Sequence, residues 1–153
     1  MALDAGITCE TTVNAPVERV FAIYSDLENA GKNVSAITSL VLLTPAPIGK
    51  GTRFRETRTM FGKDATEEME ITEFNPPRGY TVECRNHGCH YVSTFVFEPA
   101  GPTSTSVTMK FKATPLTTPA RIMSALTGWM LKGTIRKCMA KDFEDLKHAA
   151  ESA

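Results

Sequence analysis

The stretch 52–74 reads TRFRETRTMFGKDATEEMEITEF, and within each of its halves, 52–61 and 64–74, the large apolar side chains other than those at the ends are spaced by even numbers of residues. A period of two is typical of a strand with one buried face. Gly62 interrupts the pattern, and a glycine at the first central position suits a type II′ turn between antiparallel strands. The stretch therefore predicts a hairpin formed by strands 52–61 and 64–74, with one covered face.

The predicted turn determines which residues of this hairpin lie opposite each other. Arg58 would face Glu67, with Glu56 two residues along on the same apolar face. Buried charges are costly unless they are paired, so we expect an ion pair between Arg58 and Glu67. The remaining predicted pairs on that face are Phe54 with Ile71, Glu56 with Met69, and Met60 with Ala65.

This charged cluster has two interpretations. One is a structural cross-strand ion pair near the open end of the sheet. The other is a polar anchor inside a mostly apolar pocket, which would fix a ligand carboxylate, phenol or carbonyl. Such a cluster could also shift pKa values and supply a general acid or base. The sequence leaves these interpretations open.

Periodicity also predicts the elements around the hairpin. A strand at 7–13 precedes two short helical segments, and a period of two then continues to about residue 114. From residue 117 to about residue 150 the period returns to 3.6, which indicates one long helix. A one-sided sheet curls because strands twist, and only this helix is large enough to cover its apolar face. The predicted fold class is α+β, with about six to seven antiparallel strands curved around a C-terminal helix.

Composition and charge exclude several classes of function. The 153 residues predict a single domain, 1–153, and 42% hydrophobic and 22% charged residues are typical of a soluble globular protein. The 17 basic and 17 acidic side chains cancel, which argues against nucleic-acid binding. Apolar runs such as residues 40–43 are too short for a membrane span, and the N-terminus lacks the features of a secretory signal. We therefore expect a cytoplasmic protein.

No motif of a cofactor or metal enzyme is present. The sequence lacks a GxSxG elbow, a P-loop, a GxGxxG segment after a strand and an HExxH pair. Cys84, His87, Cys89 and His90 invite a zinc interpretation, but adjacent residues of a strand point to opposite faces and a fourth ligand is not evident. We expect no cofactor, no metal and free thiols, with a Cys84–Cys89 disulfide across the hairpin as the open alternative.

Five segments, spread over nearly the whole chain, match a known family in order and spacing. They are VNAPVERVF at 13–21, IGKGTRF at 48–54, ITEFNPPR at 71–78, FVFEP at 95–99 and DLK at 145–147. In these segments the chain resembles the START-like, or SRPBCC, superfamily, which includes the birch pollen allergen fold and the polyketide cyclase/dehydrase-like proteins. Many relatives carry a tryptophan after the second helix, where this chain has Asn33 and Val34. The resemblance implies a helix-grip fold that binds a small hydrophobic or aromatic ligand, lipid-, polyketide- or quinone-like, between sheet and helix.

The candidate ligand-binding residues face the predicted gap between the sheet and the long helix. Methionine is an adaptable liner for apolar ligands, and Tyr91 and Ser93 could each add a hydroxyl group. The candidates are Phe54, Glu56, Arg58, Glu67, Met69, Tyr91, Ser93, Phe95, Met109, Phe111, Leu126, Trp129 and Met130.

Two alternative functions stay open beside ligand binding. The first is a metal-free enzyme of the cyclase or dehydratase type, in which Glu56, Arg58, Glu67 and Tyr91 are the candidate acid/base or positioning groups. The second is a protein-interaction module, which would expose an apolar patch on the order of several hundred Å². The sequence assigns no catalytic residue, and it identifies neither the ligand nor the oligomeric state.

The long helix also carries four cations that suit a membrane-surface or partner-binding role: Lys132, Arg136, Lys137 and Lys141. Its apolar stripe is better explained by the sheet that the helix must cover. The stripe consists of Ile122, Leu126, Trp129, Met130, Met139, Phe143 and Leu146.

Overall fold

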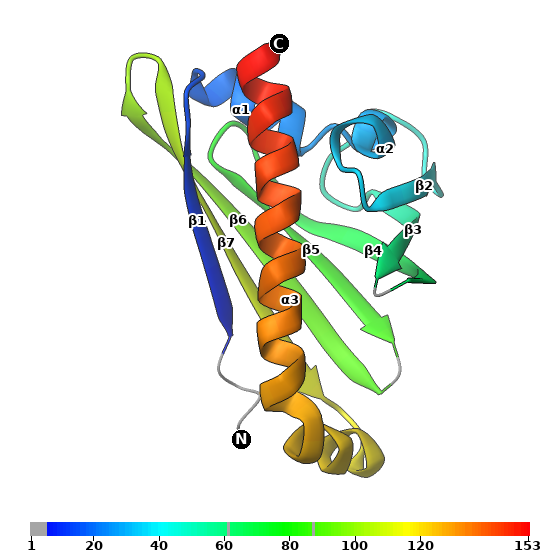
Figure 1. Cartoon of the computed structure of the whole chain (residues 1–153). Helices are drawn as coiled ribbons and strands as arrows, with labels where there is room; N and C mark the ends of the chain where they lie inside the picture. Colours follow the sequence, from blue (N-terminus) through cyan, green and yellow to red (C-terminus); the bar gives the residue numbers. More distant parts are fainter. Residues whose placement is uncertain (1–5, 61, 87) are drawn as a thin grey trace.

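Seven strands form one antiparallel sheet in the computed structural model, which describes residues 6–60, 62–86 and 88–153, the side chains of 128–131 excepted. The strands are β1 (Ile7–Val13), β2 (Ile37–Leu42), β3 (Arg53–Met60), β4 (Lys63–Asn75), β5 (Gly79–Asn86), β6 (Cys89–Gly101) and β7 (Ser104–Pro115). Their order in the sheet is β1-β7-β6-β5-β4-β3-β2, so the first and last strands of the chain are neighbours. The long helix α3 (Thr118–Ser152) lies along one face of the sheet (Figure 1).

Three short helical elements connect β1 to β2. They are α1 (Val17–Tyr24), the 3-10 helix η1 (Leu27–Asn29) and α2 (Ala30–Asn33). Pro16 caps α1 from an extended conformation, and the Asp26 side chain accepts a hydrogen bond from the backbone N–H of Asn29 to begin η1. The predicted fold class is confirmed: an antiparallel sheet of seven strands, short helices after the first strand, and one long C-terminal helix.

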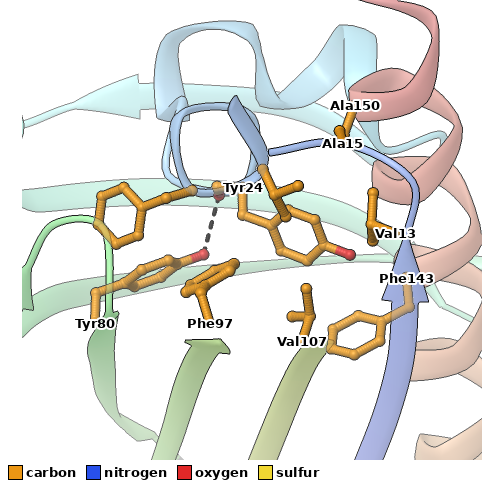
Figure 2. Packing of buried hydrophobic residues seen from close by; sticks show 10 residues of the cluster. Val13, Ala15, Tyr24, Tyr80, Phe97, Val107, Phe143 and Ala150 are labelled. Atoms are coloured by element: carbon orange, nitrogen blue, oxygen red, sulfur yellow. Dashed lines mark hydrogen bonds between the residues drawn. The ribbon is translucent and has the colours of Figure 1, made fainter. Parts of the chain in front are cut away.

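The main core lies where α1 and the C-terminal half of α3 meet the sheet (Figure 2). Phe21 of α1 packs edge-on against Phe74, Tyr80 and Phe97, with ring centroids 5.3–5.9 Å apart. The Tyr80 hydroxyl donates a hydrogen bond of 3.0 Å to the backbone carbonyl of Tyr24. Aromatic packing and this bond therefore fasten α1 to the sheet.

The register of the β3–β4 hairpin differs from the predicted one by two residues. The observed partners are Phe54 with Met69, Glu56 with Glu67, Arg58 with Ala65, and Met60 with Lys63. The predicted pairing of Arg58 with Glu67 was therefore wrong, as were the other three predicted pairs. Gly62 has a φ of 77° and is the second residue between the paired Met60 and Lys63, whereas the prediction made it the first. Because the shift is even, each side chain keeps its predicted face.

The β5–β6 hairpin separates two of the cysteines. Cys84 lies opposite Tyr91, and Cys89 lies opposite Asn86, so Cys84 and Cys89 are not cross-strand partners. All four cysteines are free thiols. The disulfide alternative is thereby excluded in this structure, and His87 of the same turn lies outside the described residues.

The first turns of α3 do not cover the sheet. They run at an angle to the rest of the helix and lie at the opposite end of the molecule from α1 (Figure 1). Ile122 and Leu126 are accordingly exposed, while Met139 and Phe143 are buried. Among the described side chains of the predicted stripe, those at its C-terminal end are therefore buried and the first two are not, because the beginning of the helix projects past the core.

Candidate functional site

A cavity of about 360 Å³ lies between the sheet and the middle of α3. Alternate residues of β3 to β7 point into it, as the period of a strand requires. The lining side chains predicted from the sequence are Glu56, Arg58, Glu67, Met69, Tyr91, Ser93, Met109 and Phe111. The others are Met60, Ala65, Val82, Cys84, Ile135, Cys138, Met139 and Asp142.

A second cavity of about 160 Å³ shares part of this lining and continues toward α1 and α2. Phe54 and Phe95, both predicted as site residues, line this smaller cavity. Leu126 is 69% exposed and lines neither cavity. The side chains of Trp129 and Met130 lie outside the described part of the chain. Most of the predicted site residues are thus brought together around two adjoining spaces.

The polar centre of both cavities is an ion-pair triad, Glu56–Arg58–Asp142. Arg58 Nε donates to Glu56 Oε1 at 3.0 Å, and Arg58 Nη1 donates to Asp142 Oδ2 at 2.9 Å. The three side chains are largely buried, with 12%, 21% and 20% of Glu56, Arg58 and Asp142 exposed. Arg58 therefore pairs with its neighbour on β3 and with α3, because the observed register places Ala65 and not Glu67 opposite it.

Burial raises the pKa values of the two carboxyl groups in this triad. It raises the pKa of Glu56 despite the opposing effect of Arg58, and the nearby carboxylates of Asp142 and Glu67 raise it further. Burial likewise raises the pKa of Asp142, and again Arg58 opposes the shift. Both carboxyls are therefore easier to protonate than carboxyls in water.

Glu67 accepts a hydrogen bond from the thiol of Cys84 and does not form the predicted ion pair with Arg58. Cys84 Sγ donates a hydrogen bond of 2.9 Å to Glu67 Oε2. Burial, followed by the neighbouring Glu67, raises the pKa of Cys84 to about 12. The thiol therefore stays protonated at neutral pH and acts as a hydrogen-bond donor, since a reactive cysteine needs a lowered pKa.

Tyr91 forms the wall beside this thiol. Its ring stacks on Phe111 with centroids 5.9 Å apart, and burial, with Cys89 nearby, raises its pKa. The Tyr91 hydroxyl therefore remains protonated beside the larger cavity, where Tyr91 is one of the lining residues.

Two buried oxygens at the smaller cavity lack a hydrogen-bond partner within the described part of the chain. They are Asp142 Oδ1 and the hydroxyl of Tyr24. Buried polar atoms are normally satisfied, so an unpartnered pair beside one space suggests that a polar group belongs there.

Asp142 is the most important residue that the sequence prediction missed. Met139, Asp142, Phe143 and Leu146 follow one another at helical spacing, so an acid stands within the apolar stripe of α3. That position could have identified it as a partner for the buried arginine. No pattern in a single sequence, however, shows which strand residue a helix residue contacts.

Metal and membrane sites are not evident in the part of the chain that is described. Among those residues, no three His, Cys, Asp or Glu side chains come together as a metal site would require. Nor is any described helix both long and apolar enough to cross a membrane.

The antiparallel sheet, the long C-terminal helix and the cavity between them define a protein of the START-like, or SRPBCC, class. The family model described as polyketide cyclase / dehydrase and lipid transport matches residues 5–151, and the chain belongs to this family. No curated protein matches the sequence.

Solved structures share the fold at low sequence identity. TTHA0849 from Thermus thermophilus is 23% identical, with a TM-score of 0.79 over 97% of this chain and 98% of that one. The Zhui aromatase/cyclase from Streptomyces sp. R1128 is 13% identical, with a TM-score of 0.80 over 96% and 93% of the two chains. A START superfamily protein from Mycobacterium smegmatis is 16% identical, with a TM-score of 0.77 over 96% and 97%. At these identities the likeness shows the fold alone.

Proposed function

We propose that this protein binds a small apolar or aromatic ligand, lipid-, polyketide- or quinone-like, in the cavity between the sheet and α3. The observation that carries the proposal is a cavity of about 360 Å³ with mainly apolar walls and one polar centre. Ligand pockets typically measure about 300–1,000 Å³ and combine apolar walls with a few placed polar groups. Met69, Met109 and Met139 would supply an adaptable apolar wall for such a ligand.

The charges of the polar centre favour a particular kind of ligand. Arg58 is already paired with Glu56 and Asp142, and Glu67 adds a third carboxylate to the same cavity. A ligand carboxylate would have to displace these partners and would meet like charges. A hydroxyl group could instead donate to the carboxylate oxygens, each of which has two lone pairs. The proposed ligand is therefore uncharged and carries a phenol or alcohol.

Three matched probes test both parts of this proposal by isothermal titration: 2-naphthol, 2-methoxynaphthalene and 2-naphthoate. We expect 2-naphthol to bind best and the methoxy compound about tenfold more weakly, because a hydrogen bond to a charged group is lost. The carboxylate should bind worst. If none of the three binds, ligand binding in this cavity is rejected. If the carboxylate binds best, the cavity stands and its proposed polarity is rejected.

A second candidate function is catalysis of the cyclase or dehydratase type. The raised pKa values of Glu56 and Asp142 support it, since a carboxyl that is easier to protonate is a better general acid near neutral pH. Glu56, Arg58, Glu67 and Tyr91 remain the proposed acid/base or positioning groups. An assay with a linear poly-β-ketone thioester separates the two functions. Catalysis predicts a cyclised product that Glu56→Gln abolishes, whereas binding alone predicts an unchanged substrate.

A further inference from the structure

The beginning of α3 and the residue before it carry large apolar side chains that are about half or more exposed. Ile122 is 58% exposed, Met123 is 61% exposed and Leu126 is 69% exposed. Leu116, just before the helix, is 48% exposed. Single exposed apolar residues are common, but four within eleven positions form a patch that indicates an interaction site.

The charged residues in roughly the first two-thirds of the helix are all basic. Residues 118–141 contain five Lys or Arg and no Asp or Glu, although the whole chain has no net charge. Arg121, Arg136 and Lys137 are exposed, and none of them pairs with an acid within the described residues. The positive charge is therefore local and free to attract an anionic surface.

The exposed cations and apolar side chains of α3 do not line the cavity. Ile135, Cys138, Met139 and Asp142 line the cavity from the inner face of the helix. We use the term outer face for these exposed residues: Arg121, Ile122, Met123, Leu126, Arg136 and Lys137.

We propose that the outer face of α3 docks on a lipid bilayer that carries anionic headgroups. Exposed apolar side chains combined with cations and no acids are the pattern of a helix that lies in a membrane interface. The apolar side chains would enter the acyl boundary, and the cations would pair with lipid phosphates and carboxylates. A second copy of this chain is a poorer occupant, since a symmetric contact would bring the same cations together.

Position in the fold adds a reason for this docking. The outer face begins in the first turns of α3, at the end of the molecule remote from α1, α2 and the C-terminus (Figure 1). Its helix also forms one wall of the cavity. The docking surface does not depend on the proposed ligand, because it uses residues that do not line the cavity.

Co-sedimentation of the whole protein with vesicles tests the proposal. We expect binding to vesicles of phosphatidylcholine mixed with phosphatidylserine, and much less binding to phosphatidylcholine alone. Adding salt should release the protein, since surface charges are screened over roughly 10 Å at 0.1 M ionic strength. Failure to bind the mixed vesicles, or equal binding to both kinds, overturns the proposal.

Two pairs of double variants locate the contact. Arg136→Gln/Lys137→Gln should weaken binding about fivefold for each cation removed. Its matched control is Arg19→Gln/Lys32→Gln, which removes the same charges from exposed positions on α1 and α2 and should bind normally. Ile122→Ser/Leu126→Ser should weaken binding about tenfold or more, because two apolar side chains no longer enter the bilayer.

The Ile122→Ser/Leu126→Ser variant has its own control. Val41→Ser/Leu43→Ser alters exposed apolar residues at the β2 edge, where Val41 is 49% exposed and Leu43 is 38% exposed. This control should bind like the unmodified protein. If either control loses as much binding as its partner variant, the outer face is not the docking surface. Dimerisation that is lost in the Ile122→Ser/Leu126→Ser variant, without vesicle binding, also overturns the proposal.

Discussion

The same sheet and the same helix enclose two very different regions. At the C-terminal end of α3, side chains from α1 fill the space between helix and sheet, and Phe97, Val107 and Ala150 are completely buried. Further along, no short helix intervenes, and a cavity of about 360 Å³ remains around a buried ion-pair triad. The comparison teaches that the larger cavity lies where α1 no longer places side chains between the helix and the sheet.

Truncating one aromatic side chain in each region is the strongest test of this comparison. Phe97→Ala should lower the free energy of unfolding by about 3–5 kcal/mol, because it opens a hole in a fully packed core. Phe111→Ala, in the cavity wall, should cost only about 1–2 kcal/mol, since that side chain is half-buried and faces existing empty space. Urea denaturation measures both. Equal losses would contradict the distinction between the two regions.

Breaking the buried triad should cause the next largest loss in the free energy of unfolding. Arg58→Met leaves Glu56 and Asp142 without their cation, and we expect a loss of about 3 kcal/mol in the free energy of unfolding. Arg55→Met is the matched control on the outer side of the same strand, where Arg55 pairs with Glu68 at 2.8 Å but both are about half exposed. That variant should cost at most about 1 kcal/mol. Similar losses for the two variants would show that burial of the triad is unimportant.

Removing one charge of the triad should change which ligand the cavity prefers. Asp142→Asn takes one carboxylate from the cavity, so 2-naphthoate should bind about fivefold more tightly and 2-naphthol more weakly. Glu144→Gln makes the same charge change on the exposed side of α3 and should leave both affinities unaltered. Titration calorimetry of the two variants gives the comparison. If both variants changed the two affinities in the same way, the cause would be the overall charge of the protein and not the charge in the cavity.

The raised pKa values of Glu56 and Asp142 predict a pH dependence of stability. Because the folded protein binds these protons more tightly than the unfolded chain does, the contribution of both groups is most favourable at acid pH. It is lost as the pH rises through their raised pKa values. Asp142→Asn should remove part of this dependence, so its stability relative to the unmodified protein should increase as the pH rises. The midpoints of urea denaturation of both proteins, measured over the pH range in which carboxyl groups titrate, show whether this relative stability increases or decreases. A decrease would contradict the assigned shift.

The smallest expected effect concerns thiol reactivity. Cys84, with a pKa of about 12, should react with iodoacetamide more slowly than the half-buried Cys138, because the thiolate is the reacting form. Peptide mass spectrometry after brief alkylation distinguishes the two sites. Glu67→Gln should make Cys84 more reactive, since the carboxylate that favours its protonated form is removed.

Much of this structure could be predicted because apolar and polar residues alternate so regularly along its strands. The faces of β3 and β4 were assigned correctly even though their register was not, since a shift of two residues preserves every face. The cavity walls followed from the same alternation. Asp142 did not, because a contact between helix and strand depends on how the helix is set on the sheet. The exposure of Ile122 and Leu126 could not be predicted either, since periodicity does not show where a sheet ends beneath a helix.

The central claim is that the hollow region, and not the filled one, receives a small apolar molecule. Its most direct test is a titration of ¹³C-methyl-labelled methionines with 2-naphthol, followed by NMR. Met69, Met109 and Met139 line the cavity, whereas Met123 is exposed on the outer face. We predict that the first three signals shift together and saturate, while that of Met123 stays in place. Unchanged signals from the three cavity methionines would contradict the account.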